Sequence, residues 1–259
     1  MKKITPKSAR EFLSSVKLPS PTRARGGVEG IREIIDFNAQ KNQAMVVASD
    51  IVSFVKGVSN ERRQDIVNAS LLAQLVANKK VPDKSNIIQW YNAYFDVLEN
   101  IGWVIQDRSF SSYTEEADGL EAHEAILKVA SVFLGAAPAA LAVVISTLEA
   151  LKSMDSSKSW ITIFDRESKH VKTGHFQIAL VEQGENDEFF VSLMAFSLKA
   201  ESTITSILFF KIRNDEVELE KCSGRVTIND EVLSSIRDQV KQKITAHSND
   251  YIAKLPDLG

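Results

Sequence analysis

The residues of this chain that could do chemistry are few, and they include a single cysteine. Cys222 stands in the run LEKCSGRV, where Lys221 and Arg225 are close enough in sequence to stabilise a thiolate. A nucleophilic thiol also needs a base within reach, and no spacing along the chain pairs Cys222 with a histidine. We expect a buried or half-buried strand cysteine, with a reactive or acylated thiol as the functional alternative.

A second polar group surrounds the sequence HVKTGH. His170 and His175 can approach each other across a turn there, and Asp165 and Glu167 precede them. Two histidines and one carboxylate form a known metal-ligand set, but this turn does not by itself fix the third ligand. The pattern favours a polar hairpin turn, and we expect no metal centre.

Three further titratable residues lie in predicted helices. His123 in LEAHEA stands in an acidic run, and we expect it to be solvated, because adjacent residues do not share a helix face. Asp96 and Glu149 are flanked by apolar residues, the setting in which burial raises a carboxyl pKa for acid–base catalysis. We expect each of them to project from the edge of its helix.

Motifs of the common enzyme classes do not occur. The chain contains no GxGxxG, GxxxxGK[ST], GxSxG, HExxH or CxxC. With 11 glycines in 259 residues, it also has few of the residues that let a backbone approach a pyrophosphate. The sequence therefore favours a non-enzymatic protein without a cofactor, and an enzyme assembled from distant residues is the alternative.

The most unusual element is an uncharged apolar segment. Residues 129–148, VASVFLGAAPAALAVVISTL, contain no charged side chain over 20 positions. A membrane-spanning helix needs about 20 apolar residues. Gly135, Pro138 and three hydroxyl side chains oppose insertion, so that the free energy of insertion is close to zero.

Three interpretations of this segment compete. It is the central helix of a soluble bundle, kinked at Pro138 and covered on every side. Alternatively, it is an apolar hairpin that bends between Gly135 and Pro138, stays packed in water and rearranges into a bilayer, or it is a permanent span. The membrane interpretations assign lipid contact to eight apolar residues: Val129, Val132, Phe133, Leu134, Leu141, Val144, Ile145 and Leu148.

Before about residue 153, apolar residues recur at helical spacing. This predicts one long helix or two abutting ones over 31–55, and helices over 66–76 and 88–101, the first of these two capped near Ser59. The aromatic residues of the third helix are expected to be core: Trp90, Tyr91, Tyr94, Phe95 and Trp103.

After residue 153 the spacing falls to about two. It predicts strands over 160–164, 175–183, 188–199, 202–213 and 217–228, paired antiparallel because their connections are short. A last amphipathic helix begins after Asn229 or Asp230. The predicted fold is α+β: an N-terminal helical bundle (28–152) with a central apolar helix or hairpin, then an antiparallel sheet of four or five strands with a C-terminal amphipathic helix (158–255). This second part forms either its own domain or one domain with the bundle.

The net charge of −3 is unevenly distributed. Residues 1–26 carry a net charge of +6, so the remainder carries −9. We expect a basic, mobile N-terminal arm over 1–27, and its interrupted apolar residues argue against a cleavable Sec-type signal peptide. An acidic body argues against nucleic acid as a partner, and one cysteine excludes an intrachain disulfide. The expected location is the cytoplasm, or outside the cell by export without such a signal.

The sequence thus predicts a non-enzymatic lipid- or membrane-interacting protein, toxin-like or virulence-associated, that acts through residues 126–151. An apolar hairpin inside a helical bundle is similar in outline to α-type pore-forming toxins, although the C-terminal sheet departs from their pattern. One alternative is a soluble interaction module that buries this segment and binds a protein partner or a second copy. The other is an enzyme or acyl-carrying protein that uses Cys222.

Overall fold

The structure of the chain, a computed structural model, describes residues 4–20, 36–135, 137–153, 159–184 and 189–255. Its strands are β1 (Gln43–Val47), β2 (Asp50–Phe54), β3 (Trp103–Val104), β4 (Ser111–Ser112), β5 (Lys169–His170), β6 (Thr173–Gln183), β7 (Phe189–Ala200), β8 (Val217–Ile228) and β9 (Ile252–Lys254). Its helices are α1 (Pro6–Ser15), α2 (Asn60–Lys80), α3 (Ile87–Asn100), α4 (Thr114–Ala117), α5 (Ala122–Leu134), α6 (Pro138–Lys152), α7 (Ser159–Ser168), α8 (Asp230–Ile244) and α9 (Ser248–Tyr251).

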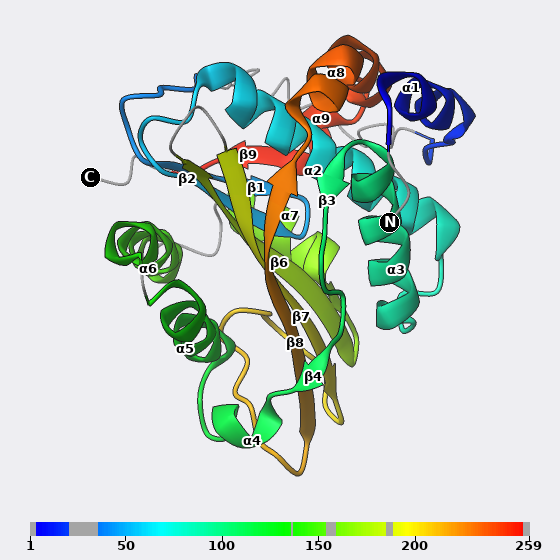
Figure 1. Cartoon of the computed structure of the whole chain (residues 1–259). Coiled ribbons are helices and arrows are strands. Elements are labelled where there is room, and N and C mark those ends of the chain that lie inside the picture. Colours follow the sequence, from blue (N-terminus) through cyan, green and yellow to red (C-terminus); the bar gives the residue numbers. More distant parts are fainter. Residues whose placement is uncertain (1–3, 21–35, 136, 154–158, 185–188, 256–259) are drawn as a thin grey trace.

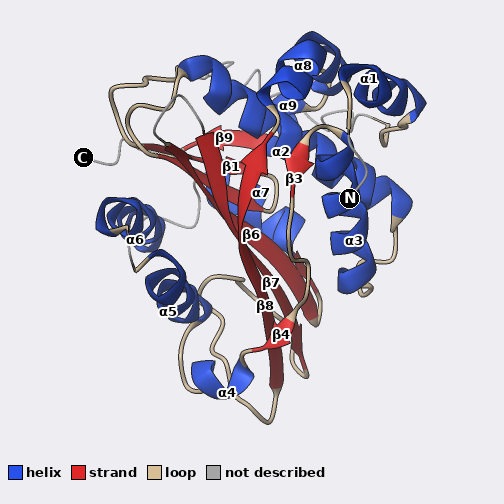
Figure 2. Cartoon of the chain, in the orientation of Figure 1, coloured by secondary structure: helices blue, strands red, loops and turns tan. Residues whose placement is uncertain are grey.

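One sheet occupies the centre of the molecule. Within the described residues it has nine strands in the order β3-β8-β7-β6-β2-β1-β9, with β4 beside β8 and β5 beside β6. Helices cover both faces (Figure 1, Figure 2): α1, α2, α3 and α8 lie over one face, and α5 and α6 over the other. The fold is mixed α/β in three layers.

The first half of the chain contributes strands to this sheet. Strand β2 pairs in parallel with β6, with Ile51 opposite Ile178, while the long strands β6, β7 and β8 form an antiparallel meander. The prediction of a separate N-terminal bundle over 28–152 is therefore wrong, because its helices are divided between the two faces of the sheet.

Strands β1 and β2 were misassigned because they are buried on both faces. Residues 43–54, expected to be helical, form β1 and β2, and all ten strand residues are buried. A strand covered on both faces reads as a continuous apolar run, which also satisfies helical spacing. Conversely, 160–164 lies in helix α7, and 202–213 forms a loop instead of a strand.

Several local signals were interpreted correctly. Helix α2 begins after Ser59, whose side chain accepts a hydrogen bond from the Arg62 amide, and α8 begins after Asn229, which caps it in the same way. The three long strands match the predicted ranges, and β8 continues through Gly224. The five aromatic side chains of the third predicted helix and its end are all buried.

The N-terminal segment contains a packed helix. In α1, Ala9 and Leu13 are fully buried in the core that includes α8, so residues 6–15 are not the mobile arm that their charge suggested. The expected arm also covers residues 1–3 and 21–27, which lie outside the described residues.

A buried polar network joins α2 and α3 to the turn between β1 and β2. Asp50 is 1% exposed, and its Oδ2 accepts hydrogen bonds from the Ser70 hydroxyl of α2 and the Tyr94 hydroxyl of α3. From α2, Gln74 accepts a hydrogen bond from the Ser49 amide and donates one to the Val47 carbonyl. These directional bonds fix the position of this helical layer on the sheet.

Burial raises the pKa of Asp50 to about 7, although the hydrogen bonds from Ser70 and Tyr94 oppose the shift. Its Oδ1 has no hydrogen-bond partner among the described residues, which suits a protonated carboxyl. The folded state then binds this proton more tightly than the unfolded state. The stabilisation of the fold by this bound proton is complete below about pH 4 and is lost as the pH rises through about 7.

Replacing Asp50 by asparagine should remove this pH dependence. The introduced amide keeps an acceptor for Ser70 and Tyr94 but cannot ionise, so Asp50→Asn should exceed the wild type in unfolding free energy at pH 8 by up to about 4 kcal/mol. Near pH 4 the two proteins should be about equally stable. Urea unfolding at both pH values measures this, and an equal difference at both would contradict it.

Candidate functional site

The apolar segment 129–148 forms most of a helical hairpin. Helix α5 ends at Leu134 and α6 begins at Pro138, which occupies the first turn, where its missing N–H is not needed. A Cβ at Gly135 would lie 2.9 Å from the Ser131 carbonyl oxygen, so the turn requires glycine. The predicted bend between Gly135 and Pro138 is confirmed, and the single kinked or membrane-spanning helix is wrong. In the described part of the chain, no helix combines the length and the apolar composition needed to cross a membrane.

The hairpin buries one of its faces against the sheet. Four of the eight predicted lipid contacts, Val129, Leu134, Val144 and Leu148, are at most 3% exposed and belong to the core shared with β2, β6 and β7. Three more, Phe133, Leu141 and Ile145, are half-buried. Val132 alone among the eight is exposed, at 87%.

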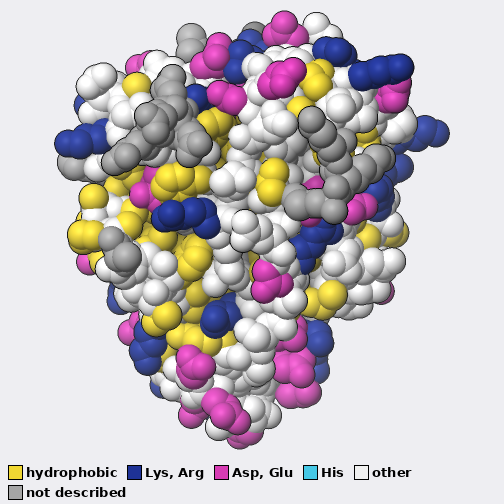
Figure 3. Space-filling model, in the orientation of Figure 1, with side chains coloured by type: hydrophobic (Ala, Val, Ile, Leu, Met, Phe, Trp, Pro, Cys, Tyr) yellow, Lys and Arg dark blue, Asp and Glu magenta, His cyan; other side chains and the backbone are white. Residues whose placement is uncertain are grey.

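Between Val129 and Leu148 the outer face of the hairpin is exposed and uncharged, whereas Glu124, Lys128 and Glu149 are exposed on the same two helices outside that range. Hydrophobic side chains gather over α5 and α6 on the left of the molecule in Figure 3. The exposed positions of the turn and of the flanking helices are Ser131, Val132, Gly135, Pro138, Ala139, Ala142 and Ser146. The segment is therefore not covered on every side, as a central bundle helix would be.

Few polar contacts hold the hairpin in place. Thr147 Oγ1 of α6 donates to the Val143 carbonyl oxygen and lies 3.1 Å from Ser53 Oγ of β2, so Ser53 is the donor between them. At the other end, the amides of Ala122 and His123 donate to carbonyl oxygens of the loop between β7 and β8. The interface is otherwise apolar.

His123 connects the two ends of the hairpin. It is 5% exposed, so the expectation of a solvated histidine is wrong. Its Nε2 lies 3.3 Å from Lys152 Nζ at the end of α6, and its Nδ1 lies 3.2 Å from Glu121 Oε2 before α5. A neutral imidazole can accept a hydrogen bond from the Lys152 ammonium, whereas a protonated imidazole cannot.

Cys222 is a buried residue of β8. Its side chain is 7% exposed, and Sγ lies 3.9 Å from the Asp107 carbonyl oxygen. Burial raises the pKa of the thiol to about 11, Asp107 adds to the rise, and Lys221 opposes it. Burial therefore outweighs the lowering of the thiol pKa that was expected from the nearby cations. Acylation of Cys222 remains a prediction.

His170 and His175 do come together, with ring centroids 6.2 Å apart, and His175 lies 4.1 Å from the Trp90 ring. Burial, reinforced by the charge of Lys84, lowers the pKa of His170 to about 4 and that of His175 well below its usual value. Asp165 is engaged elsewhere, accepting a hydrogen bond from the Ile207 amide. Among the described residues no three His, Cys, Asp or Glu side chains could hold a metal together.

The remaining predicted carboxylates lie on the surface. Asp96 is exposed and 3.7 Å from Arg108, and Glu149 is exposed on α6. A carboxyl group whose pKa does lie near neutrality is that of Asp50, which the sequence interpretation missed. The available signal was an acidic residue between two apolar runs, MVVAS and IVSFV.

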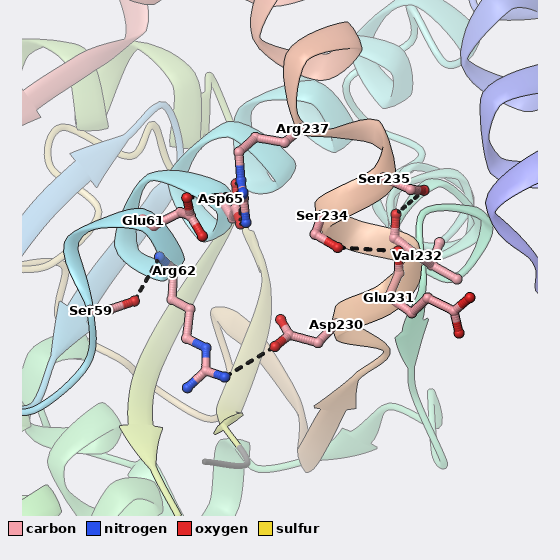
Figure 4. A network of polar contacts seen from close by, with 10 residues as sticks. All are labelled: Ser59, Glu61, Arg62, Asp65, Asp230, Glu231, Val232, Ser234, Ser235 and Arg237. Atoms are coloured by element: carbon pink, nitrogen blue, oxygen red, sulfur yellow. Dashed lines mark hydrogen bonds and ion pairs between the residues drawn. The ribbon is translucent and has the colours of Figure 1, made fainter.

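A polar cavity of about 410 Å³ lies between α2 and α8 (Figure 4). Arg237 of α8 makes a two-pronged ion pair with buried Asp65 of α2 and a second ion pair with Glu61. Arg62 pairs with Asp230 at 3.0 Å. The two arginines are thus engaged by three carboxylates, so the arrangement fastens α8 to α2 and does not favour an anionic ligand.

Comparisons with known proteins identify no family for this chain. No family model and no curated protein matches it. A solved structure titled "DELTA-ENDOTOXIN" covers 80% of this chain and 92% of its own at 16% identity, with a TM-score of 0.42. The "Structure of the Evf virulence factor" covers 76% and 82% at 10% identity, with a TM-score of 0.33. At TM-scores this low, neither likeness carries an argument about function.

Proposed function

We propose that this protein binds lipid membranes through the hairpin α5–α6, as a non-enzymatic, membrane-active and toxin-like factor. The observation that carries the proposal is a hairpin without a charged side chain from Val129 to Leu148 that lies at the molecular surface. A surface helix of a soluble protein ordinarily carries charged residues on its outer side. Here that side carries no charge from Val129 to Leu148, where Val132 and small residues occupy it, and the exposed charges begin only at Lys128 and Glu149.

The length of the charge-free part of each helix suggests how deep the hairpin enters. Residues 129–134 of α5 and 138–148 of α6 correspond to about 9 and about 17 Å at 1.5 Å per residue. A bilayer has a hydrocarbon core of about 30 Å. The hairpin therefore suits shallow insertion, with its turn at Gly135 leading and the charged residues Lys128 and Glu149 remaining in water.

Membrane binding of useful strength requires the hairpin to leave the sheet. In the closed state Val132 is the fully exposed member of the eight lipid contacts, and burying such a side chain contributes about 1.5–3 kcal/mol. The four buried and three half-buried contacts can contribute only after release. Lipid tails replace the apolar contacts that the sheet provided, so the hairpin itself loses little hydrophobic burial.

One side-chain contact joins the two ends of the hairpin to each other. His123 of α5 lies 3.3 Å from Lys152 of α6 and 3.2 Å from Glu121. Because this contact lies within the hairpin, release from the sheet leaves it intact. The acidic run before α5 opposes approach to lipid, since ionised carboxylates enter lipid at high cost: Glu115, Glu116, Asp118, Glu121 and Glu124.

Flotation and dye release test lipid binding. We expect the protein to float with phosphatidylcholine vesicles and to release dye from them within the range from about pH 5 to about pH 7.5. The range extends to acid because protonated carboxylates enter lipid more easily than ionised ones. Absence of binding at both ends of this range would overturn the proposal.

A charge on the outer face should block insertion without unfolding the protein. Val132→Asp places a carboxylate at a position that is 87% exposed, so the folded state should tolerate it. In lipid, the same charge costs about 2.5–3.5 kcal/mol, which predicts roughly 100-fold weaker vesicle binding. Val171→Asp is the control, because Val171 is 71% exposed but lies outside the hairpin. Equal loss of binding in both variants would contradict a specific role of the hairpin.

A further inference from the structure

Strand β8 is paired on one side along its length but on the other side only near its two ends. There, β3 pairs with Thr227 and Ile228, and β4 pairs with Glu220 and Lys221. Among the described strands none pairs with residues 222–226 on that side. The opposing segment, 105–110, has one residue more than this gap, so it bulges away from the edge instead of pairing. Figure 1 shows this connection running beside β8 between β3 and β4.

The gap leaves strand backbone groups available. The Tyr113 amide donates to the Leu219 carbonyl oxygen, and the Leu219 amide donates to Thr114 Oγ1, so the groups of Leu219 point to this edge. Because these groups alternate along a strand, those of Ser223 and Arg225 point the same way. No backbone hydrogen bond from the described segment 105–110 reaches them.

A cavity of about 230 Å³ lies at this gap, on the α3 side of the sheet. Its apolar lining comes from α3, β7, β8 and the segment after β3: Phe95, Ile105, Leu193, Ala195, Cys222 and Val226. Its volume exceeds the roughly 150 Å³ of an engineered cavity that binds benzene. The hairpin α5–α6 lies on the opposite face of the sheet, so this site is separate from the proposed membrane contact.

Gly224 keeps the cavity open. It pairs with Leu193, and its side-chain position lies between Cys222 and Val226 on the same face. A Cβ added there would meet no atom within 4 Å, and no positive φ requires glycine. Glycine weakens a strand interior and often marks a place that a ligand approaches closely.

The charges around the cavity disfavour an anion. Arg225 contributes its backbone to the edge, whereas its guanidinium lies over the Phe190 ring at 4.2 Å. Asp107 lines the cavity, and its hydrogen bond with the Ser109 amide favours the ionised carboxylate. A negative ligand would be repelled by this carboxylate, while the Arg225 guanidinium is already held over the Phe190 ring.

We propose that the cavity beside Gly224 binds a small neutral molecule with an apolar body and an amide-type group. An amide offers a donor and an acceptor side by side, as a paired strand residue does, and can satisfy the edge groups of Ser223 and Arg225. The apolar body occupies the space that the missing side chain leaves.

Three probes with one ring test this chemistry: benzamide, benzoate and toluene. Benzamide should shift the amide NMR signals of Ser223 and Arg225 with a roughly millimolar dissociation constant, as expected for a molecule of this size. Benzoate, repelled by Asp107, and toluene, without the amide, should each bind at least about tenfold more weakly. No shift of these two signals at about 10 mM benzamide, or equal binding of all three probes, would overturn the proposal.

Gly224→Val, which fills the cavity, is the variant that tests whether benzamide binds there. Valine suits a strand, and its Cβ has free space, so the variant should fold with unchanged circular dichroism. Benzamide should no longer shift the two signals. The control Thr227→Val changes an exposed residue on the other face of β8 and should leave binding intact. Should Gly224→Val fail to fold, Ala195→Leu fills the same cavity from β7, and wild-type binding in either folded variant would contradict the site.

Discussion

The apolar contact between the hairpin α5–α6 and the central sheet governs what the rest of the molecule can do. It buries the large side chains of an uncharged segment while leaving small residues outside, so the chain can carry that segment in water. Hydrophobic burial has no directional requirement. The same side chains can therefore exchange the sheet for another apolar environment without leaving hydrogen bonds unmade.

The two helical layers differ in this respect. On the α2–α3 side, Asp50 and Gln74 belong to a buried hydrogen-bond network, and Arg237 fastens α8 to α2 through Asp65. Removing that layer would leave buried polar groups without hydrogen-bond partners, which costs about 1–3 kcal/mol for each unsatisfied group. On the hairpin side, the polar contacts with the rest of the fold reduce to a few, notably Ser53 with Thr147 and the Ala122 and His123 amides with the loop between β7 and β8. The hairpin is thus the layer that can separate at the lower cost.

How far the sequence could predict this arrangement depended on how local each signal was. Caps at Ser59 and Asn229, the alternating strands β6 to β8 and the bend between Gly135 and Pro138 depend on neighbouring residues, and all are present. Strands β1 and β2 were misassigned because full burial on both faces removes the polar alternation that distinguishes a strand from a helix.

The candidate sites were harder to predict because they depend on distant partners. His123 is buried by Phe209 and Lys152, and Asp50 by residues of two helices, none of them near in sequence. The eight residues assigned to lipid contact lie on a hairpin, and that assignment stays a prediction. Periodicity could not say that half of them face a sheet whose strands come from both ends of the chain. The reactivity of Cys222 was hard to predict for the same reason, since burial raises the pKa of its thiol more than the charge of its neighbour Lys221 lowers it.

Locking the hairpin to the sheet tests most directly whether it must separate. Ser53 Oγ and Thr147 Oγ1 are 3.1 Å apart, so cysteines at both positions, in a Cys222→Ser background, are close enough to form a disulfide. The oxidised protein should fail to float with phosphatidylcholine vesicles at about pH 5, and reduction should restore binding to the level of the Cys222→Ser parent treated in the same way. Equal vesicle binding by the oxidised and reduced forms would contradict release of the hairpin as the step that brings this protein to a membrane.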